Sequence, residues 1–87
     1  MKINETQVKK DILNFVNLKN EKIKLSDKLD SLQYLKLFFF LEKKLKIKFS
    51  EKDFNSKKID TINGLISIIK KNNLATFYTF QLNYSNF

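Results

Sequence analysis

The pair Asp30-Ser31 places a carboxylate beside a hydroxyl, directly before the apolar run LQYLKLFFF. A serine at this position can serve as the N-cap of a helix, or as an exposed hydroxyl to which another enzyme attaches a group. Serine is among the best N-cap residues, and a neighbouring carboxylate suits the positive end of a helix. A nucleophilic serine needs a base, and the sequence lacks histidine, the commonest one. We therefore expect a capping or modified serine and not a catalytic one.

The residue types that are missing narrow the chemistry further. The chain contains no cysteine, which excludes disulfides, thiolate nucleophiles and zinc–thiolate clusters. The absence of histidine also removes the commonest metal ligand. With 87 residues the chain makes one domain with a single modest core. We expect a protein that is not an enzyme and that has no metal site.

The charge is strongly positive, with 17 basic residues against 9 acidic ones and a net charge of +8. Lysines neutralise phosphates, so a small basic helical module that binds nucleic acid or an anionic surface is one candidate function. Every basic residue is lysine, however, and arginine is the side chain that reads guanine edges and phosphates with two hydrogen bonds. Specific nucleic-acid recognition is therefore not expected.

The sequence also bears on location. No stretch approaches the roughly 18 apolar residues of a membrane span. The opening MKINETQVKK lacks the apolar segment of a secretory signal. We expect a cytoplasmic protein without a membrane span.

Helical periodicity predicts two long helices in the first half of the chain. Apolar residues recur at helical spacing from Val8 to Val16, which predicts a first helix from about Glu5 to Leu18. A polar connection follows, and a second helix is expected from Ser31 to about Lys46.

Capping residues predict the elements of the second half. Ser50 and Asp53 have the spacing of a capping box, which favours a short helical turn around residues 51–56. Asp60 is the expected N-cap of a last clear helix, whose C-terminal end is suited by Lys70 and Lys71. The buried stripe of that helix is expected to be Ile62, Leu65, Ile66 and Ile69.

Two segments alternate apolar and polar residues, as a strand does. Over residues 45–49 the apolar side chains of Leu45, Ile47 and Phe49 alternate with lysines. We assign this segment to the end of the second helix and a loop anchored by Ile47 and Phe49. Residues 74–87 carry no charged side chain and alternate over 78–84. They could form a strand, an additional packing segment, or a tail that docks on a second copy.

The second helix carries apolar residues on two opposite faces. At about 100° per residue one face is a core stripe, formed by Tyr34, Leu37, Phe38, Leu41 and Leu45. The opposite face holds Leu32, Leu35 and Phe39 and continues as Lys43 and Lys46, with Lys36 beside it. Phe40 lies at the border. Exposed apolar residues are common, but three in one row favour a docking surface.

The tripeptide Asp30-Ser31-Leu32, at the head of a long helix, resembles the motif of the acyl carrier protein family and its peptidyl carrier relatives. LEKKLKIKF resembles the end of the family's second helix and the following loop. KKIDTINGLISIIKK resembles the passage from its short third helix into its last. The resemblance spans about Glu5 to Lys71 and implies an all-α, four-helix bundle of acyl-carrier type, with three longer helices and one short one. The carrier domain would cover residues 1–73, followed by an aromatic C-terminal extension over 74–87.

The resemblance implies a function as a carrier. In that family a phosphopantetheinyl transferase attaches a 4′-phosphopantetheine arm from coenzyme A to the motif serine, and the thiol of the arm holds cargo as a thioester. Ser31 would be the attachment site, and Asp30 would help to position the incoming group. The cargo would be acyl or aminoacyl intermediates, delivered between loading and transfer enzymes.

The resemblance also implies where partners and cargo bind. Partner enzymes would contact Leu32, Leu35 and Phe39, with Lys36 and Lys43 setting the charge preference. Cargo would shelter between the second and third helices, in a space lined by Leu37, Phe38, Leu41, Phe54, Ile59 and Ile62. A monomer is expected, with a dimer through the tail as the alternative.

Two features depart from the family pattern. The family usually has a glycine shortly before the aspartate, and residues 26–29 contain none. Carriers of fatty-acid synthesis present an acidic second helix to basic enzymes, whereas this helix is rich in lysine. Because like charges disfavour docking, a specialised biosynthetic pathway is expected and not bulk fatty-acid synthesis.

Overall fold

The computed structural model describes the backbone of residues 3–85 and the side chains of residues 3–73. Four α-helices and two 3₁₀ turns occur in this part of the chain: α1 (Glu5–Val16), η1 (Leu25–Asp27), α2 (Ser31–Leu45), α3 (Glu51–Phe54), η2 (Lys57–Asp60) and α4 (Ile62–Ser85). No strand is found between residues 3 and 85. The predicted all-α bundle of three longer helices and one short helix is therefore confirmed.

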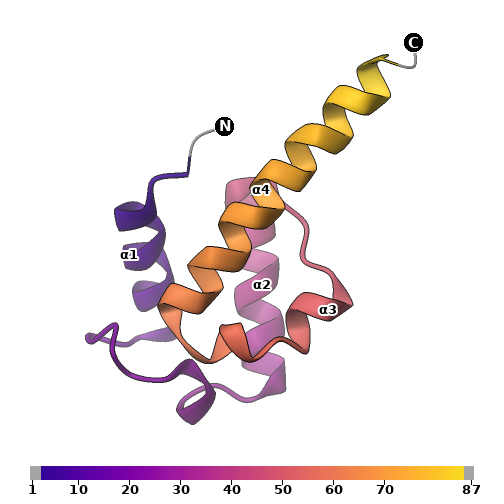
Figure 1. The fold of residues 1–87 in the computed structure, drawn as a ribbon. Coiled ribbons are helices and arrows are strands. Elements are labelled where there is room, and N and C mark those ends of the chain that lie inside the picture. The colour runs from indigo at the N-terminus through magenta and orange to yellow at the C-terminus, as the bar shows by residue number, and fades with distance from the viewer. Residues whose placement is uncertain (1–2, 86–87) are drawn as a thin grey trace.

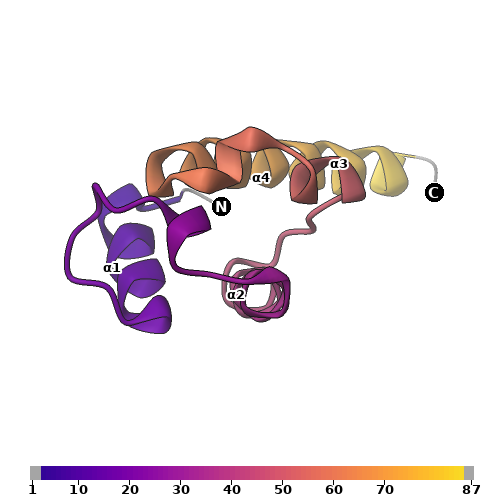
Figure 2. The ribbon, with the colours of Figure 1, turned by 90° about the horizontal axis from the view of Figure 1, so that it is seen from below.

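The helices lie in two layers. α1 and α2 form one layer, and α3 and α4 form the other (Figure 2). α4 crosses the bundle diagonally, and its C-terminal half extends beyond the other helices (Figure 1). The start of α2 lies at the opposite end of the bundle from this extension (Figure 1).

The first two long helices end without glycine. Asn17 and Lys46, the residues after α1 and α2, adopt left-handed conformations with φ of 58° and 55°. Asparagine tolerates this conformation well, whereas lysine adopts it at some cost in backbone energy. Between Lys46 and α3 the chain forms neither helix nor strand, and Ile47 is only 2% exposed. The predicted loop, anchored by Ile47 and Phe49, is confirmed, because Phe49 also packs against the core.

The core is built from one face of each long helix, together with single residues from the connections. The predicted stripe of α4 is fully confirmed, and four of the five predicted core residues of α2 are buried, with Leu45 partly buried at the edge. The buried apolar residues are Val8, Ile12, Leu25, Tyr34, Leu37, Phe38, Leu41, Ile47, Ile59, Ile62, Leu65, Ile66, Ile68 and Ile69.

A hydrogen bond joins the first turn of α2 to η2. The Tyr34 hydroxyl donates to the carbonyl of Ile59 at 3.1 Å. Burial, together with the charges of Asp60 and Asp27, raises the pKa of Tyr34 to about 12. The phenol therefore stays protonated and keeps this bond at every physiological pH.

The start of α4 differs from the prediction. Asp60 was expected to cap the helix, but it is the last residue of η2, and α4 begins two residues later at Ile62. The cap is Thr61, whose Oγ1 accepts the backbone N–H of Gly64 at 3.0 Å. The expectation is wrong because residues 57–60 form a 3₁₀ turn, which moves the helix start past the aspartate.

The end of α4 also differs. Lys70 and Lys71 were expected near the C-terminal end, but the helix continues to Ser85. Lys70 instead forms an ion pair with Glu5 of α1, and Lys71 lies 3.8 Å from the carboxylate of Asp53. The helix passes residue 73 without a break, so a strand over residues 74–85 is ruled out. The side chains beyond residue 73, and with them the alternative of a dimer through the tail, lie outside the described residues.

Gly64 is required by a close approach between α4 and η2. A Cβ at this position would lie 2.0 Å from the carbonyl oxygen of Lys58, a backbone atom that has no freedom to rotate away. The glycine thus allows η2 to pack directly on the first turn of α4.

Gly64→Ala tests this contact. Replacing glycine by alanine inside a helix normally stabilises it by about 1 kcal/mol, whereas here the forced separation should cost about 1–3 kcal/mol. Urea unfolding of the two proteins measures the difference. A stabilised variant would contradict the required contact.

Asp53 is a buried carboxylate that joins α3 to α4. Its residue is 4% exposed, and its Oδ2 accepts the backbone N–H of Ser50 and the side-chain amide of Asn72, both at 2.9 Å. The Ser50 Oγ accepts the N–H of Asp53 in return, so the predicted capping box is confirmed. Burial alone would raise the pKa of Asp53, but the hydrogen bonds and the charge of Lys71 outweigh it and hold the pKa below its usual value.

The lowered pKa predicts a pH-dependent stability. The contribution of Asp53 is complete above the pKa of the unfolded carboxyl group, near 3.9, and is lost as the pH falls through the lower native pKa. Asp53→Asn should therefore cost about 1–3 kcal/mol at neutral pH, and this difference should shrink as the solution is acidified. Urea unfolding over a series of pH values measures it.

Glu51→Gln is the matched control, since Glu51 is an exposed carboxylate in the same short helix. It should change the free energy of unfolding by less than about 0.5 kcal/mol at any of these pH values. A cost for Asp53→Asn that does not change with pH would contradict the role of its charge.

Candidate functional site

The start of α2 is capped by Asp30. Its Oδ1 accepts the backbone N–H of Gln33 at 2.8 Å, and the Gln33 side-chain oxygen accepts the N–H of Asp30 at 2.9 Å. These two bonds form a complete capping box. The interpretation of Ser31 as the N-cap is therefore wrong, because the equally suitable aspartate one residue earlier takes that position and Ser31 becomes the first helical residue.

The Ser31 side chain is consequently free. It is exposed, and its hydroxyl makes no hydrogen bond with the described residues. It lies at the positive end of a 15-residue helix, where a phosphate group is electrostatically favoured. A phosphodiester on this hydroxyl would thus break no hydrogen bond to a described residue, and its negative charge would lie at the positive end of the helix dipole.

The predicted partner residues lie along the outer face of α2. Leu32 and Phe39 are 59% and 57% exposed, and Lys36 and Lys43 are exposed as well. Leu35 is half-buried, so it contributes only part of its side chain to this face. Leu32 and Phe39, at the two ends of the predicted apolar row, therefore face solvent as expected, whereas Leu35 at its centre does so only in part.

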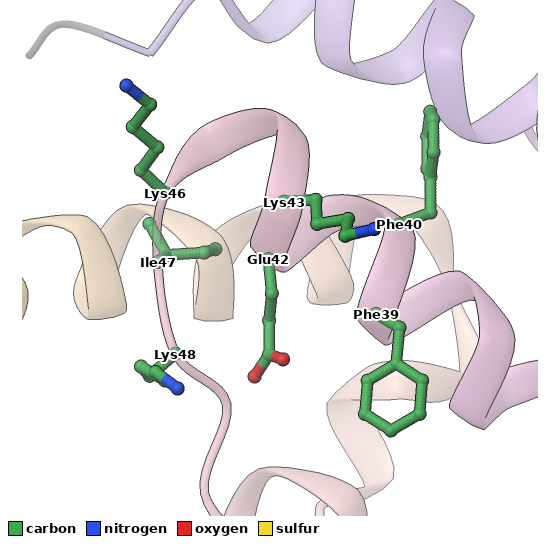
Figure 3. A pocket seen from close by; sticks show the side chains of 7 residues that line it. All are labelled: Phe39, Phe40, Glu42, Lys43, Lys46, Ile47 and Lys48. Atoms are coloured by element: carbon green, nitrogen blue, oxygen red, sulfur yellow. The ribbon is translucent and has the colours of Figure 1, made fainter.

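The three consecutive phenylalanines point in three directions. Phe38 is buried, Phe39 is exposed, and Phe40 lies between. The ring of Phe40 stacks on Phe15 of α1 with a centroid distance of 4.7 Å. Figure 3 shows Phe39 and Phe40 on opposite sides of α2.

An open groove of about 650 Å³ follows the C-terminal half of α2. Its walls come from α2 and from the loop after it, and include residues that sequence reasoning did not connect to the docking face. The lining residues are Phe39, Phe40, Glu42, Lys43, Lys46, Ile47 and Lys48 (Figure 3). Lys48, which stands between Ile47 and Phe49, is the available signal, and the sequence places it in a loop without a role.

The predicted cargo residues are brought together, but they pack against one another. Leu37, Leu41 and Ile62 have no exposed surface, Phe38 is 1% exposed and Ile59 is 8% exposed, while Phe54 is half-buried. The Phe38 ring lies 4.3 Å from that of Phe49 and 4.5 Å from that of Phe54, between centroids. A cargo chain that entered along Phe38 would have to part these rings.

Neither a cluster of metal ligands nor a membrane-spanning helix occurs in the part of the chain that the structure describes. No three or more Asp or Glu side chains gather there as a metal site requires. Nor does any helix of that part have the length and apolar character needed to cross a membrane.

No family model, curated protein or solved structure matches this chain. The interpretation of the site therefore depends on its own residues and geometry.

The capping geometry predicts effects of different size on stability for substitutions at Asp30 and Ser31. Asp30→Ala removes the cap and should lower the free energy of unfolding by about 1 kcal/mol. Ser31→Ala removes an unbonded hydroxyl and should change it by less than about 0.5 kcal/mol. Urea unfolding of both variants measures the two effects. A loss in Ser31→Ala as large as that in Asp30→Ala would show that the serine takes part in capping.

Proposed function

We propose that this protein is a carrier that holds acyl or aminoacyl intermediates on a 4′-phosphopantetheine arm attached to Ser31. One observation carries the proposal. The Ser31 hydroxyl is exposed at the start of α2 and makes no hydrogen bond with a described residue, because Asp30 already caps the helix. A serine that served only the helix would be expected to make the capping bond itself.

The attachment requires a separate transferase. The hydroxyl oxygen of Ser31 would bond to the phosphorus of the arm as the pyrophosphate bond of coenzyme A breaks. Adenosine 3′,5′-bisphosphate would leave, and a base of the transferase would take the serine proton. When attached, the arm supplies a thiol that carries cargo as a thioester and keeps it at high effective concentration near successive enzymes.

Asp30 would have two roles in this proposal. Its Oδ1 accepts the N–H of Gln33, which fixes the backbone next to Ser31. The residue is exposed, so its carboxylate would remain open to the transferase and its metal ion. The cap therefore presents the hydroxyl and a negative charge together.

The packing around Phe38 supports small or briefly held cargo. The contacts of this ring with Phe49 and Phe54 occupy the region where carriers of this kind would shelter a chain. Separating the three rings would lose burial and stacking energy, on the order of 0.5–1.5 kcal/mol for each aromatic pair. The burial of a long acyl chain would have to offset this loss of packing energy, whereas a small group could stay outside the core.

Intact mass tests the proposal. The protein is incubated with coenzyme A, Mg²⁺ and a promiscuous phosphopantetheinyl transferase. We expect a gain equal to one phosphopantetheine group, since a single exposed serine stands in the Asp-Ser-Leu motif. Ser31→Ala should gain nothing.

Ser26→Ala is the matched control, because Ser26 is also exposed and lies in η1 next to an aspartate. This variant should be loaded as the wild type is. If the native protein gains no mass, or if Ser31→Ala gains as much as the native protein, the carrier function is wrong.

A further inference from the structure

One side of α2 carries an uninterrupted row of exposed lysine and apolar residues. We call this row the outer stripe, and it consists of Leu32, Lys36, Phe39, Lys43 and Lys46. Their spacing of four, three, four and three residues keeps them on one side of the helix or at its end. Leu32 and Phe39, its apolar members, are more than half exposed.

The lysines of the outer stripe form no ion pair in the part of the molecule whose side chains the structure describes. Lys44, which points to α1, pairs with Asp11 at 3.1 Å and lies 5.7 Å from the centre of the Phe40 ring. Lys36, Lys43 and Lys46, in contrast, form no ion pair with a described carboxylate. α2 thus has a neutralised inner side and an unneutralised outer one.

Glu42, an acidic residue of the groove beside the outer stripe, is already engaged in a hydrogen bond. Glu42 lines the same groove as Lys43, but its Oε2 accepts the backbone N–H of Phe49 at 2.8 Å. This bond draws the carboxylate towards the loop after α2, away from Lys43 (Figure 3). Exposed Lys48, on that loop, adds a further positive charge at the end of the groove.

We infer that the outer stripe is the docking surface for a protein partner whose own face is acidic around an apolar centre. Phe39 would enter the apolar centre, and carboxylates of the partner would meet Lys36 and Lys43. Protein interfaces often bury an aromatic anchor at their centre and place polar and charged residues at their rim. Complementary charges accelerate the encounter of the two proteins and select between partners. This inference builds on the proposed function, because such a partner would sit beside Ser31, the residue before Leu32.

Other occupants fit the outer stripe less well. A second copy that docked symmetrically through the same surface would bring lysines against lysines. A nucleic acid would use the lysines but would leave Phe39 and Leu32 without an apolar partner, unless bases stacked on the ring. An acidic protein face satisfies the charged and the apolar residues together.

A titration of the unmodified full chain with defined probes tests the inference. The first probe is an amphipathic helical peptide with a leucine stripe flanked by glutamates, and the second has lysine in place of every glutamate. Chemical shifts of the ¹⁵N-labelled protein report affinity and site. We expect the acidic peptide to bind at residues 32–46 and at least about tenfold more tightly than the basic one, with a strong dependence on salt.

Variants of the outer stripe should alter this preference. Lys36→Glu with Lys43→Glu should reverse it, so that the basic peptide binds more tightly. Phe39→Ala should weaken binding of the acidic peptide by about fivefold or more without affecting the fold, since the ring is exposed. Lys10→Glu with Lys19→Glu changes the net charge equally, at exposed positions outside α2, and should preserve the preference.

Several outcomes would overturn the inference. These are failure of the acidic peptide to bind, equal affinity for both peptides, or an unchanged preference in the Lys36→Glu, Lys43→Glu protein. Binding of single-stranded DNA or of phosphatidylglycerol vesicles at the same residues, as tight as that of the acidic peptide, would assign the stripe to polyanions. Because the unmodified chain is used, none of these results depends on whether Ser31 accepts the arm.

Discussion

The reciprocal hydrogen bonds between Asp30 and Gln33 determine where α2 begins, and the positions of its side chains depend on that starting point. Because Asp30 caps the helix, Ser31 is the first helical residue and its hydroxyl is left over. Each following residue then takes its place around the helix axis, with Phe38 towards the core and Phe39 towards solvent. A start one residue later would turn the whole helix by about 100° relative to the cap.

The inner face of α2 connects this helix to the rest of the bundle. Phe38 contacts Phe49 and Phe54, which come from the loop and from α3, while Tyr34 bonds to η2. Asp53 then joins α3 to Asn72 of α4. A short helix of four residues has little stability of its own, so these contacts hold it in place. The outer face of α2 is thereby supported by the whole domain.

The sequence predicted the parts of the fold that depend on hydrophobic periodicity, and it failed where two neighbouring residues could each cap the same helix. Apolar spacing located α1, α2, α4 and most of the core correctly, because burial of one face stabilises each helix. Asp30 and Ser31 are equally good caps, and only the backbone conformation decides between them. Asp60 was misjudged because a 3₁₀ turn leaves little periodic signal. The period-two pattern after residue 73 left a strand among three alternatives, whereas the helical backbone of α4 continues to Ser85.

The lysines of α2 are best understood through the difference between its two sides. If composition alone had placed them, paired and unpaired lysines should be mixed around the helix. Instead Lys44 meets Asp11 on the inner side, whereas Lys36 and Lys43, one turn before and one turn after exposed Phe39, form no ion pair with a described carboxylate. Positive charge around an apolar centre would cost affinity for any basic enzyme, because like charges at an interface repel. On the proposed function, the arrangement would therefore exclude basic partners as well as select acidic ones, next to the serine hydroxyl that the capping of α2 leaves available.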